Sequence, residues 1–297
     1  MRKILVIGRL GQVAQALKAT QPNDYRVDYL GREALDIRNR QRIAQVLQQE
    51  SYEQVINASG YTQVDAAETD SQAAFALNHL AVKALADCCA EHGVRLIHLS
   101  SDYVFDGRQN RPYRPDDTPQ PLNLYGKSKW RGELAVLSNA SSQAQEQGKG
   151  YACIVRTAWL YSAYGQNFVK TMLKLMAQGK PVKIIDDQWG TPTSAIALSE
   201  FIWQLTELSH LDPIYHWSDL GVTNWYEFAR ETGLQAYNLG LIAQATKISP
   251  TSTQDYGAPA PRPPYSALDC SQSQTILPAK PWQVNLSQVL QQLLKEG

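Results

Sequence analysis

The chain has no excess of charge of either sign, since its 297 residues include 28 basic and 28 acidic side chains. This balance excludes the strongly basic field typical of nucleic-acid-binding proteins, so a phosphate on a ligand must be held by local groups. Four cysteines are few for this length, none stands in a Cys-x-x-Cys pair, and the five histidines lack metal-ligand spacing. We therefore expect reduced thiols, no bound metal and no nucleic-acid partner.

Long apolar runs are absent as well. The run Ile4–Ile7 near the N-terminus is too short for the core of a signal peptide, and no later run is long enough to span a bilayer. We therefore expect a cytoplasmic protein with no membrane partner. The length allows one nucleotide-binding core with a smaller appended lobe.

Short apolar runs alternate with helical-period segments through the first half of the chain. Strands are predicted at residues 4–7, 25–30, 54–58, 94–99 and 152–156, and helices at 12–20, 39–50, 71–92 and 125–138. This alternation is typical of an α/β fold in which helices cover both faces of a parallel sheet. After residue 160 the pattern loosens, with helices predicted at 168–178, 196–208 and 286–295 and a strand at 182–185.

These elements predict two parts of unequal size. We expect a Rossmann-type doubly wound parallel sheet over residues 1–160, which binds the cofactor. Residues 161–297 are expected to form mainly a smaller C-terminal substrate-binding lobe, with some elements returning to pack on the first sheet.

A glycine turn follows the first predicted strand. The segment Gly8-Arg9-Leu10-Gly11-Gln12-Val13-Ala14 lies between that strand and a helix, which is the context of a dinucleotide-binding turn. Gly8 suits a tight turn, and Gly11 lets backbone N–H groups approach a pyrophosphate. An ordinary strand–helix turn is the alternative, and the position before a βα pattern favours the dinucleotide. We expect cofactor contacts from Gly8, Gly11, Gln12 and Val13.

The tip of the second strand bears on the choice between NADPH and NADH. NADH enzymes tend to place a carboxylate there, whereas this strand ends Tyr29-Leu30-Gly31-Arg32. Arg32 can pair with a 2′-phosphate, although Glu33 beside it opposes that role and a solvated arginine is the alternative. We expect NADPH, with NADH as the second choice. Further cofactor contacts are expected from Asp36, Ile37, Ala58, Ser59 and Gly60, with an N-cap as the alternative role of Asp36.

A hydroxyl, a phenol and an ammonium form the candidate catalytic set. Ser100 and Ser101 end a predicted strand, and adjacent strand residues point to opposite sides, so only one of them can face a site. Tyr125 and Lys129 stand four residues apart and share one face of a helix. The ammonium is expected to lower the pKa of the phenol and to hold the nicotinamide ribose, while the serine stabilises a reacting carbonyl. Tyr125 and Lys129 are thus also expected to contact the cofactor.

These motifs resemble extended short-chain dehydrogenase/reductases, and within them the family of dTDP-4-dehydrorhamnose reductases. The similarity covers nearly the whole chain and is most specific at Val64-Asp65-x-x-Glu68 and Arg262-Pro263. It implies that Ser101 is the catalytic hydroxyl, where the family usually has threonine. It also implies substrate contacts from Val64, Asp65, Tyr103, Trp159 and Arg262. From the residues alone, Trp159 could equally be a core aromatic and Arg262 a surface residue.

The resemblance implies NADPH-dependent reduction of the C4 ketone of dTDP-4-dehydro-6-deoxy-L-mannose to dTDP-L-rhamnose, a precursor of surface polysaccharides. The alternatives are a non-catalytic regulatory subunit of the same fold and another nucleotide-sugar reductase or epimerase. Some members bind magnesium at a dimer contact through a glutamate, whereas Ala16 stands at that position here. We therefore expect no metal and a monomer or weak dimer.

Overall fold

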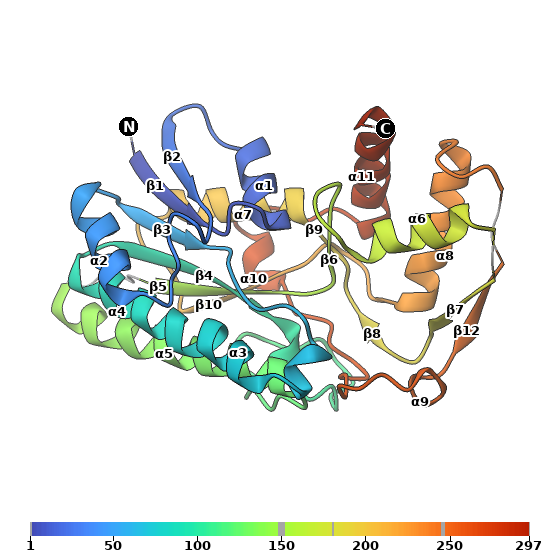
Figure 1. Ribbon diagram of the computed structural model, residues 1–297, viewed down its shortest axis with the longest axis horizontal. Helices are drawn as coiled ribbons and strands as arrows, with labels where there is room; N and C mark the ends of the chain where they lie inside the picture. Colours follow the sequence, from blue (N-terminus) through green and yellow to red (C-terminus); the bar gives the residue numbers. More distant parts are fainter. Residues whose placement is uncertain (1, 148–151, 180, 245–246, 297) are drawn as a thin grey trace.

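The computed structural model describes residues 2–147, 152–179, 181–244 and 247–296 (Figure 1). Its largest element is a six-stranded sheet in which every neighbouring pair of strands is parallel. The strand order is β2 (Tyr25–Leu30), β1 (Arg2–Ile7), β3 (Gln54–Asn57), β4 (Arg95–Ser101), β5 (Ala152–Thr157) and β10 (Ile214–Trp217). This is the predicted Rossmann-type α/β architecture.

The strands of this sheet carry apolar side chains on both faces, and helices cover both faces and bury them. Along β1, Ile4 and Val6 belong to one buried cluster, and Leu5 and Ile7 belong to the other. Figure 1 shows the first face covered by α1 (Gln12–Ala19) and α7 (Ala195–Glu207). The second face is covered by α2 (Arg40–Gln49), α4 (Ala81–Glu91) and α5 (Leu124–Gln147).

The predicted helix over residues 71–92 is present, with a wider turn in its middle. It consists of α3 (Ser71–Phe75), a π-helical turn η2 (Ala76–Leu80) and α4. Wider π turns accommodate an extra residue and often occur at functional sites. Here the turn carries the buried Asn78, whose side chain binds both backbone polar groups of Tyr61 and the Ser128 hydroxyl.

The stretch Ser71–Glu91 is also long and apolar enough to cross a membrane by length and composition. The apolar side chains of α4, however, pack into the core of the domain: Val82, Leu85 and Cys88 are buried against the sheet. The composition of this stretch is therefore that of a core helix.

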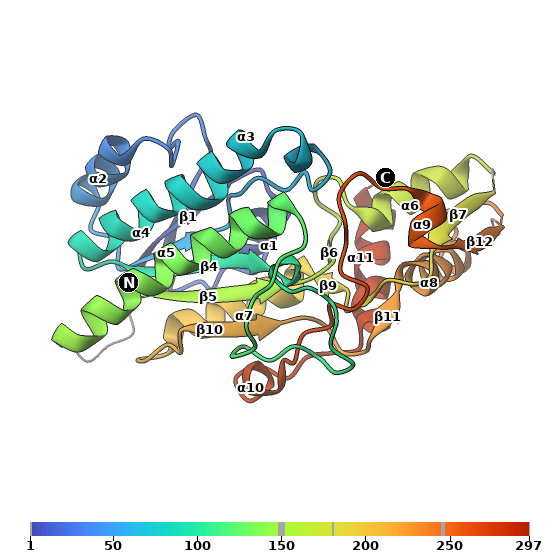
Figure 2. The same cartoon turned by 90° about the horizontal axis from the view of Figure 1, so that it is seen from below.

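The second half of the chain contributes to both parts of the molecule. β10 and α7 belong to the sheet domain, whereas α6 (Phe168–Ala177), α8 (Trp225–Asn238) and α11 (Trp282–Glu296) pack together beside it (Figures 1 and 2). Two strands beside these helices, β7 (Val182–Ile185) and β12 (Ile248–Thr251), pair in parallel. The remaining short elements are η1 (Ala66–Glu68), η3 (Asp102–Val104), β6 (Leu160–Tyr161), β8 (Trp189–Gly190), β9 (Thr193–Ser194), β11 (Thr223–Asn224), α9 (Thr253–Tyr256) and α10 (Ser271–Gln274).

The strand order reverses direction at β1. The chain moves from β1 outward to β2, and then returns across β1 to form β3 on its other side. In open α/β sheets, ligands bind at the carboxyl ends of the strands where such a reversal occurs. This topology directs attention to the ends of β1 and β3.

Candidate active site

A cavity of about 740 Å³ lies at the carboxyl ends of β1 and β3. Its wall includes the predicted glycine turn, the residues after β2 and the residues after β3. The sequence-predicted cofactor residues that line it are Gly8, Gly11, Gln12, Val13, Arg32, Asp36, Ile37, Ala58, Ser59 and Gly60. Segments more than 50 residues apart therefore meet around one space large enough for a nucleotide.

Gly8 makes the close turn at the end of β1. Its φ of +106° lies in the region that favours glycine, and a Cβ there would be 2.9 Å from the carbonyl carbon of Ala58. The Gly11 amide donates to the Gly8 carbonyl, and α1 begins at the next residue. No side chain of α1 caps its first turn, which leaves amide donors at the edge of the cavity.

The Gln12 side chain joins the glycine turn to the second half of the chain. Its Oε1 accepts hydrogen bonds from the Ser162 hydroxyl at 2.7 Å and from Asn167 Nδ2 at 3.0 Å. The sequence suggested a direct cofactor contact for this residue. In the structure, Gln12 lines the cavity while its amide oxygen is already engaged.

Three arginines and two carboxylates surround the far end of the cavity. Arg32 is 77% exposed and lies 3.5 Å from Asp36, while Arg38 binds the same carboxylate through two nitrogens. The bond from Arg38 holds the pKa of Asp36 at about 2. Arg9 pairs with Glu33 at 2.7 Å. Sequence reasoning missed Arg9 and Arg38, since neither occupies the strand tip that the fingerprint identifies.

The loop after β3 is shaped by a buried asparagine. Asn57 Oδ1 accepts from the amide and the hydroxyl of Ser59, which is a local side-chain turn. This turn places Ala58 and Gly60 on the cavity wall. A Cβ on Gly60 would lie 3.9 Å from Lys129 Nζ, so this loop also connects the cavity to the candidate catalytic residues.

The three candidate catalytic residues are all buried. Ser101 ends β4, Tyr125 lies in the first turn of α5, and Lys129 follows one turn later; they are 8%, 8% and 5% exposed. Ser101 Oγ lowers the pKa of Tyr125 through a hydrogen bond, which brings the two side chains together. Ser100, the rival hydroxyl, makes no side-chain hydrogen bond within the described residues.

The start of α5 is fixed against the turn that follows β4. Asn123 Oδ1 accepts from the Gly126 amide at 2.7 Å, and Glu68 Oε1 accepts from the Leu124 amide at 2.7 Å. A Cβ on Gly126 would lie only 2.2 Å from the Tyr103 carbonyl oxygen. Glycine at this position therefore allows α5 to approach closely enough for Tyr125 to reach Ser101.

The protonation of the site differs from the sequence-based expectation. Burial raises the pKa of Tyr125 to about 12, and the charge of Asp102 acts in the same direction. Lys129 does not offset this, because its own burial lowers its pKa to about 8 and its Nζ donates to the Leu99 carbonyl at 2.6 Å. The predicted lowering of the Tyr125 pKa is therefore wrong for this structure.

Asp102 is a buried carboxyl that sequence reasoning missed. It is 1% exposed, follows Ser101 directly, and its Oδ1 accepts from Ser101 Oγ at 2.9 Å. Burial raises its pKa to about 6. Its adjacency to a candidate catalytic serine at a strand end was the only signal in the sequence.

Four of the five predicted substrate residues gather near Tyr125. Asp65 and Arg262, 197 residues apart, form a two-pronged ion pair with distances of 2.9 and 2.8 Å. The Tyr103 ring packs edge-on against Tyr125 at 5.6 Å, and Val64 belongs to the same cluster. The Arg262 bond holds the pKa of Asp65 below its usual range.

Trp159, the fifth, stacks on a second tryptophan. Its ring lies 3.6 Å from that of Trp225 with an angle of 9° between them, and a Cβ on Gly190 would lie 2.7 Å from it. Its φ of +46° is uncommon for a bulky residue and is tolerated only where surrounding packing holds it. Trp225 was not identified from the sequence.

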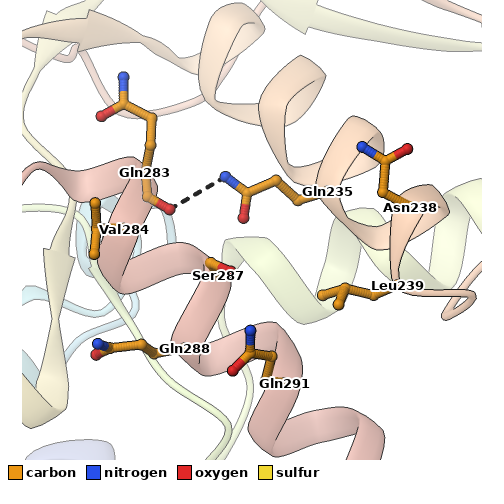
Figure 3. Close-up of a pocket in the computed structure, with 8 residues that line it drawn as sticks. All are labelled: Gln235, Asn238, Leu239, Gln283, Val284, Ser287, Gln288 and Gln291. Atoms are coloured by element: carbon orange, nitrogen blue, oxygen red, sulfur yellow. Dashed lines mark hydrogen bonds between the residues drawn. The ribbon is translucent and has the colours of Figure 1, made fainter.

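A second hollow, of about 640 Å³, lies between α8 and α11 (Figure 3). It is lined mainly by amide side chains, and Gln235 Nε2 donates to the Gln283 carbonyl at 3.1 Å. Its lining contains no charged or titratable side chain. Over the part of the chain that the structure describes, no cluster of three histidine, cysteine or carboxylate side chains could hold a metal.

Comparison with known proteins agrees with this geometry. A family model described as "RmlD substrate binding domain" matches residues 1–295. A dTDP-4-dehydrorhamnose reductase of Sinorhizobium fredii is 34% identical over 99% of both chains. A dTDP-4-keto-6-deoxy-D-glucose reductase of Streptomyces niveus is 32% identical, covering 96% of this chain and 95% of its own.

A solved structure is similar over almost the same length. The dTDP-4-dehydrorhamnose reductase of Bacillus anthracis, in complex with NADP, superposes with a TM-score of 0.89 at 30% identity. The match covers 98% of this chain and 100% of that one.

Proposed function

The chain belongs to the dTDP-4-dehydrorhamnose reductase family, and on that premise we propose that it reduces the C4 ketone of dTDP-4-dehydro-6-deoxy-L-mannose to dTDP-L-rhamnose with NADPH. The observation that carries this proposal is the buried set of Ser101, Tyr125 and Lys129 beside the glycine-turn cavity. A regulatory protein with the same fold has no physical need for a hydroxyl, a phenol and an ammonium at that place.

The cavity residues fit a dinucleotide. The turn at Gly8 excludes a side chain, and Gly11 precedes an uncapped helix start that can receive a pyrophosphate. Arg32 is the exposed arginine at the end of β2 and would hold a 2′-phosphate, with Asp36 and Ile37 beside the adenine. When bound, the nicotinamide supplies the hydride. The related B. anthracis structure contains NADP, which supports the same cofactor here.

The protein's own residues would then handle the charge and the proton. Ser101 donates a hydrogen bond to the keto oxygen and stabilises the negative charge that develops there. Tyr125 transfers its phenolic proton to that oxygen and becomes a phenolate. Lys129 stabilises the phenolate and orients the nicotinamide ribose. Because the pKa of Tyr125 is raised to about 12, its phenolate needs stabilisation by a nearby positive charge. Lys129 Nζ now donates to the Leu99 carbonyl, so turnover requires it to contact Tyr125 as well.

The substrate would lie between the two parts of the molecule. Asp65, Val64 and Tyr103 come from the first part, whereas Arg262 comes from the last third of the chain. Residues 1–160 would hold the cofactor, and residues 161–297 would complete the substrate site. Trp159 would form an apolar wall, since Trp225 holds its ring in place. We further propose a cytoplasmic enzyme that acts as a monomer or weak dimer, without a metal, membrane or nucleic-acid partner.

The S. niveus relative favours a second candidate substrate, a 4-keto-6-deoxyhexose of different configuration. The test measures NADPH and NADH oxidation separately with both dTDP-linked ketones, using the wild type and Tyr125→Phe. We expect turnover with dTDP-4-dehydrorhamnose and a loss of about 10²–10⁴-fold in kcat for Tyr125→Phe, the usual contribution of a general acid. The affinity for NADPH should stay unchanged. Equal turnover by Tyr125→Phe would contradict the mechanism, and no oxidation with either ketone would contradict the function.

A further inference from the structure

The mechanism above does not use the carboxyl nearest to the reacting groups. Asp102 is 1% exposed, and its Oδ1 accepts a hydrogen bond from Ser101 Oγ at 2.9 Å. The same serine oxygen accepts from the Tyr103 amide at 3.2 Å. A hydroxyl has a single proton, so a serine that donates to a carboxylate has no proton for a keto oxygen.

Burial of Asp102 favours its neutral form, whereas the hydrogen bonds that it accepts favour its charged form. Tyr103 follows it in the 3-10 turn η3, Tyr125 faces it from α5, and the Ser266 hydroxyl approaches from the C-terminal segment. Arg262 lies beyond Tyr103, where Asp65 binds it. Burial is the largest influence and raises the pKa of Asp102 to about 6. Its Oδ2 is buried, and no donor among the described residues lies at hydrogen-bonding distance and angle from it.

We propose that Asp102 is a positioning residue: its protonated carboxyl donates to Ser101 Oγ and leaves the Ser101 proton free for the keto oxygen. This inference rests on the proposed function. When the carboxyl is ionised, it binds the Ser101 proton itself, and its charge opposes the negative charge that develops on the keto oxygen. Neither Asp102 nor Ser101 loses a proton during the reaction, because the proton that reaches the substrate comes from Tyr125.

The test is the pH dependence of kcat/KM, which reports groups of the free enzyme. For the wild type we expect kcat/KM to fall about fivefold between pH 6 and 7, the loss given by one required proton with a pKa near 6. In Asp102→Asn, the amide has the same shape and can donate to Ser101 at every pH. This fall should therefore be absent, while the Kd for NADPH stays at the wild-type value.

Two further variants separate positioning from a structural role. Asp106→Asn changes a carboxylate of the same loop whose partner, the Tyr113 hydroxyl, lies outside the site, and should keep the wild-type profile. Ser101→Ala should be slower by about 10²–10³-fold, as for loss of one oxyanion donor. Its fall near pH 6 should be smaller than that of the wild type, because only the effect of the Asp102 charge remains. If Asp102→Asn does not fold, the comparison of the pH profiles of Ser101→Ala and the wild type still tests the inference.

The outcomes are distinct. An active wild type whose fall between pH 6 and 7 persists in Asp102→Asn, or is as large in Ser101→Ala as in the wild type, overturns this inference and leaves the reductase intact. A uniform loss of rate in Asp102→Asn with an unchanged profile also overturns it, since that is the mark of a structural role. A wild type that reduces no dTDP-linked ketone removes the proposed function together with this inference.

Discussion

Gly126→Ala tests whether the close approach of α5 to the turn after β4 builds the site. Glycine lies in the first helical turn, and replacement by alanine usually stabilises a helix by about 1 kcal/mol. In this structure, however, the new Cβ would lie 2.2 Å from the Tyr103 carbonyl oxygen and 3.0 Å from Pro121 Cβ. The first contact involves backbone, so no side-chain rotation can relieve it.

The size of the required movement follows from these distances. The contact must lengthen by at least 0.8 Å, from 2.2 Å to the 3.0 Å below which real Cβ contacts essentially do not occur. Overpacking of this kind typically costs about 1–3 kcal/mol, which exceeds the gain in helix propensity. The start of α5 carries Tyr125, and a misplacement of about 1 Å can reduce a rate about 10²-fold.

We therefore expect Gly126→Ala to lower both the free energy of unfolding in urea and kcat, the latter about 10²-fold. Gly233→Ala in α8 is the matched control, because its Cβ would meet side chains and no backbone: the flexible Met176 at 3.1 Å and Ile248 at 3.8 Å. That variant should keep the wild-type kcat, and its free energy of unfolding should lie within about 1 kcal/mol of the wild-type value. A Gly126→Ala protein as stable and as active as the control would refute the packing argument.

Two more predictions concern cofactor choice and pH. Arg32→Ala should weaken NADPH binding about 10–100-fold, the worth of a charged hydrogen bond, with little effect on NADH. Binding titrations of both nucleotides check this, with Arg26→Ala at the other end of β2 as control; equal losses for both would exclude a 2′-phosphate contact. Burial raises the pKa of Asp219 from 3.8 to about 7, so the folded state binds a proton that the unfolded state has lost between these values. Stability should therefore fall as pH rises from about 4 to 7, and Asp219→Asn should reduce this fall in urea unfolding at several pH values; an unchanged slope would contradict the assignment.

The strands and helices of the first half could be predicted because each has a local signature. A strand buried on both faces is a continuous apolar run, as at Ile4–Ile7, and an amphipathic helix repeats every three to four residues. The predicted helix over residues 71–92 is confirmed, but the sequence did not indicate the π turn in its middle, where Asn78 binds Tyr61 and Ser128. The periodicity of a sequence reports local structure and does not show which distant residues a side chain will contact.

The second half was predicted less completely for the same reason. β10 and α8 were not identified, although Trp217 and Phe228 in them are almost fully buried. β10 is a strand because β5 offers it a parallel edge, and α8 is ordered by its contacts with α6 and α11. Such elements depend on surfaces that exist only after the sheet has formed.

From the sequence alone come the fold class, the dinucleotide turn, the Ser101, Tyr125 and Lys129 set and, through resemblance, the family. These depend on residue types and on short spacings along the chain, both of which can be read directly from the sequence. The tertiary structure alone decided the ionisation of the site. Burial raised the pKa of Tyr125 and Asp102 and lowered that of Lys129, because desolvation depends on every neighbour that excludes water, most of them distant in the chain.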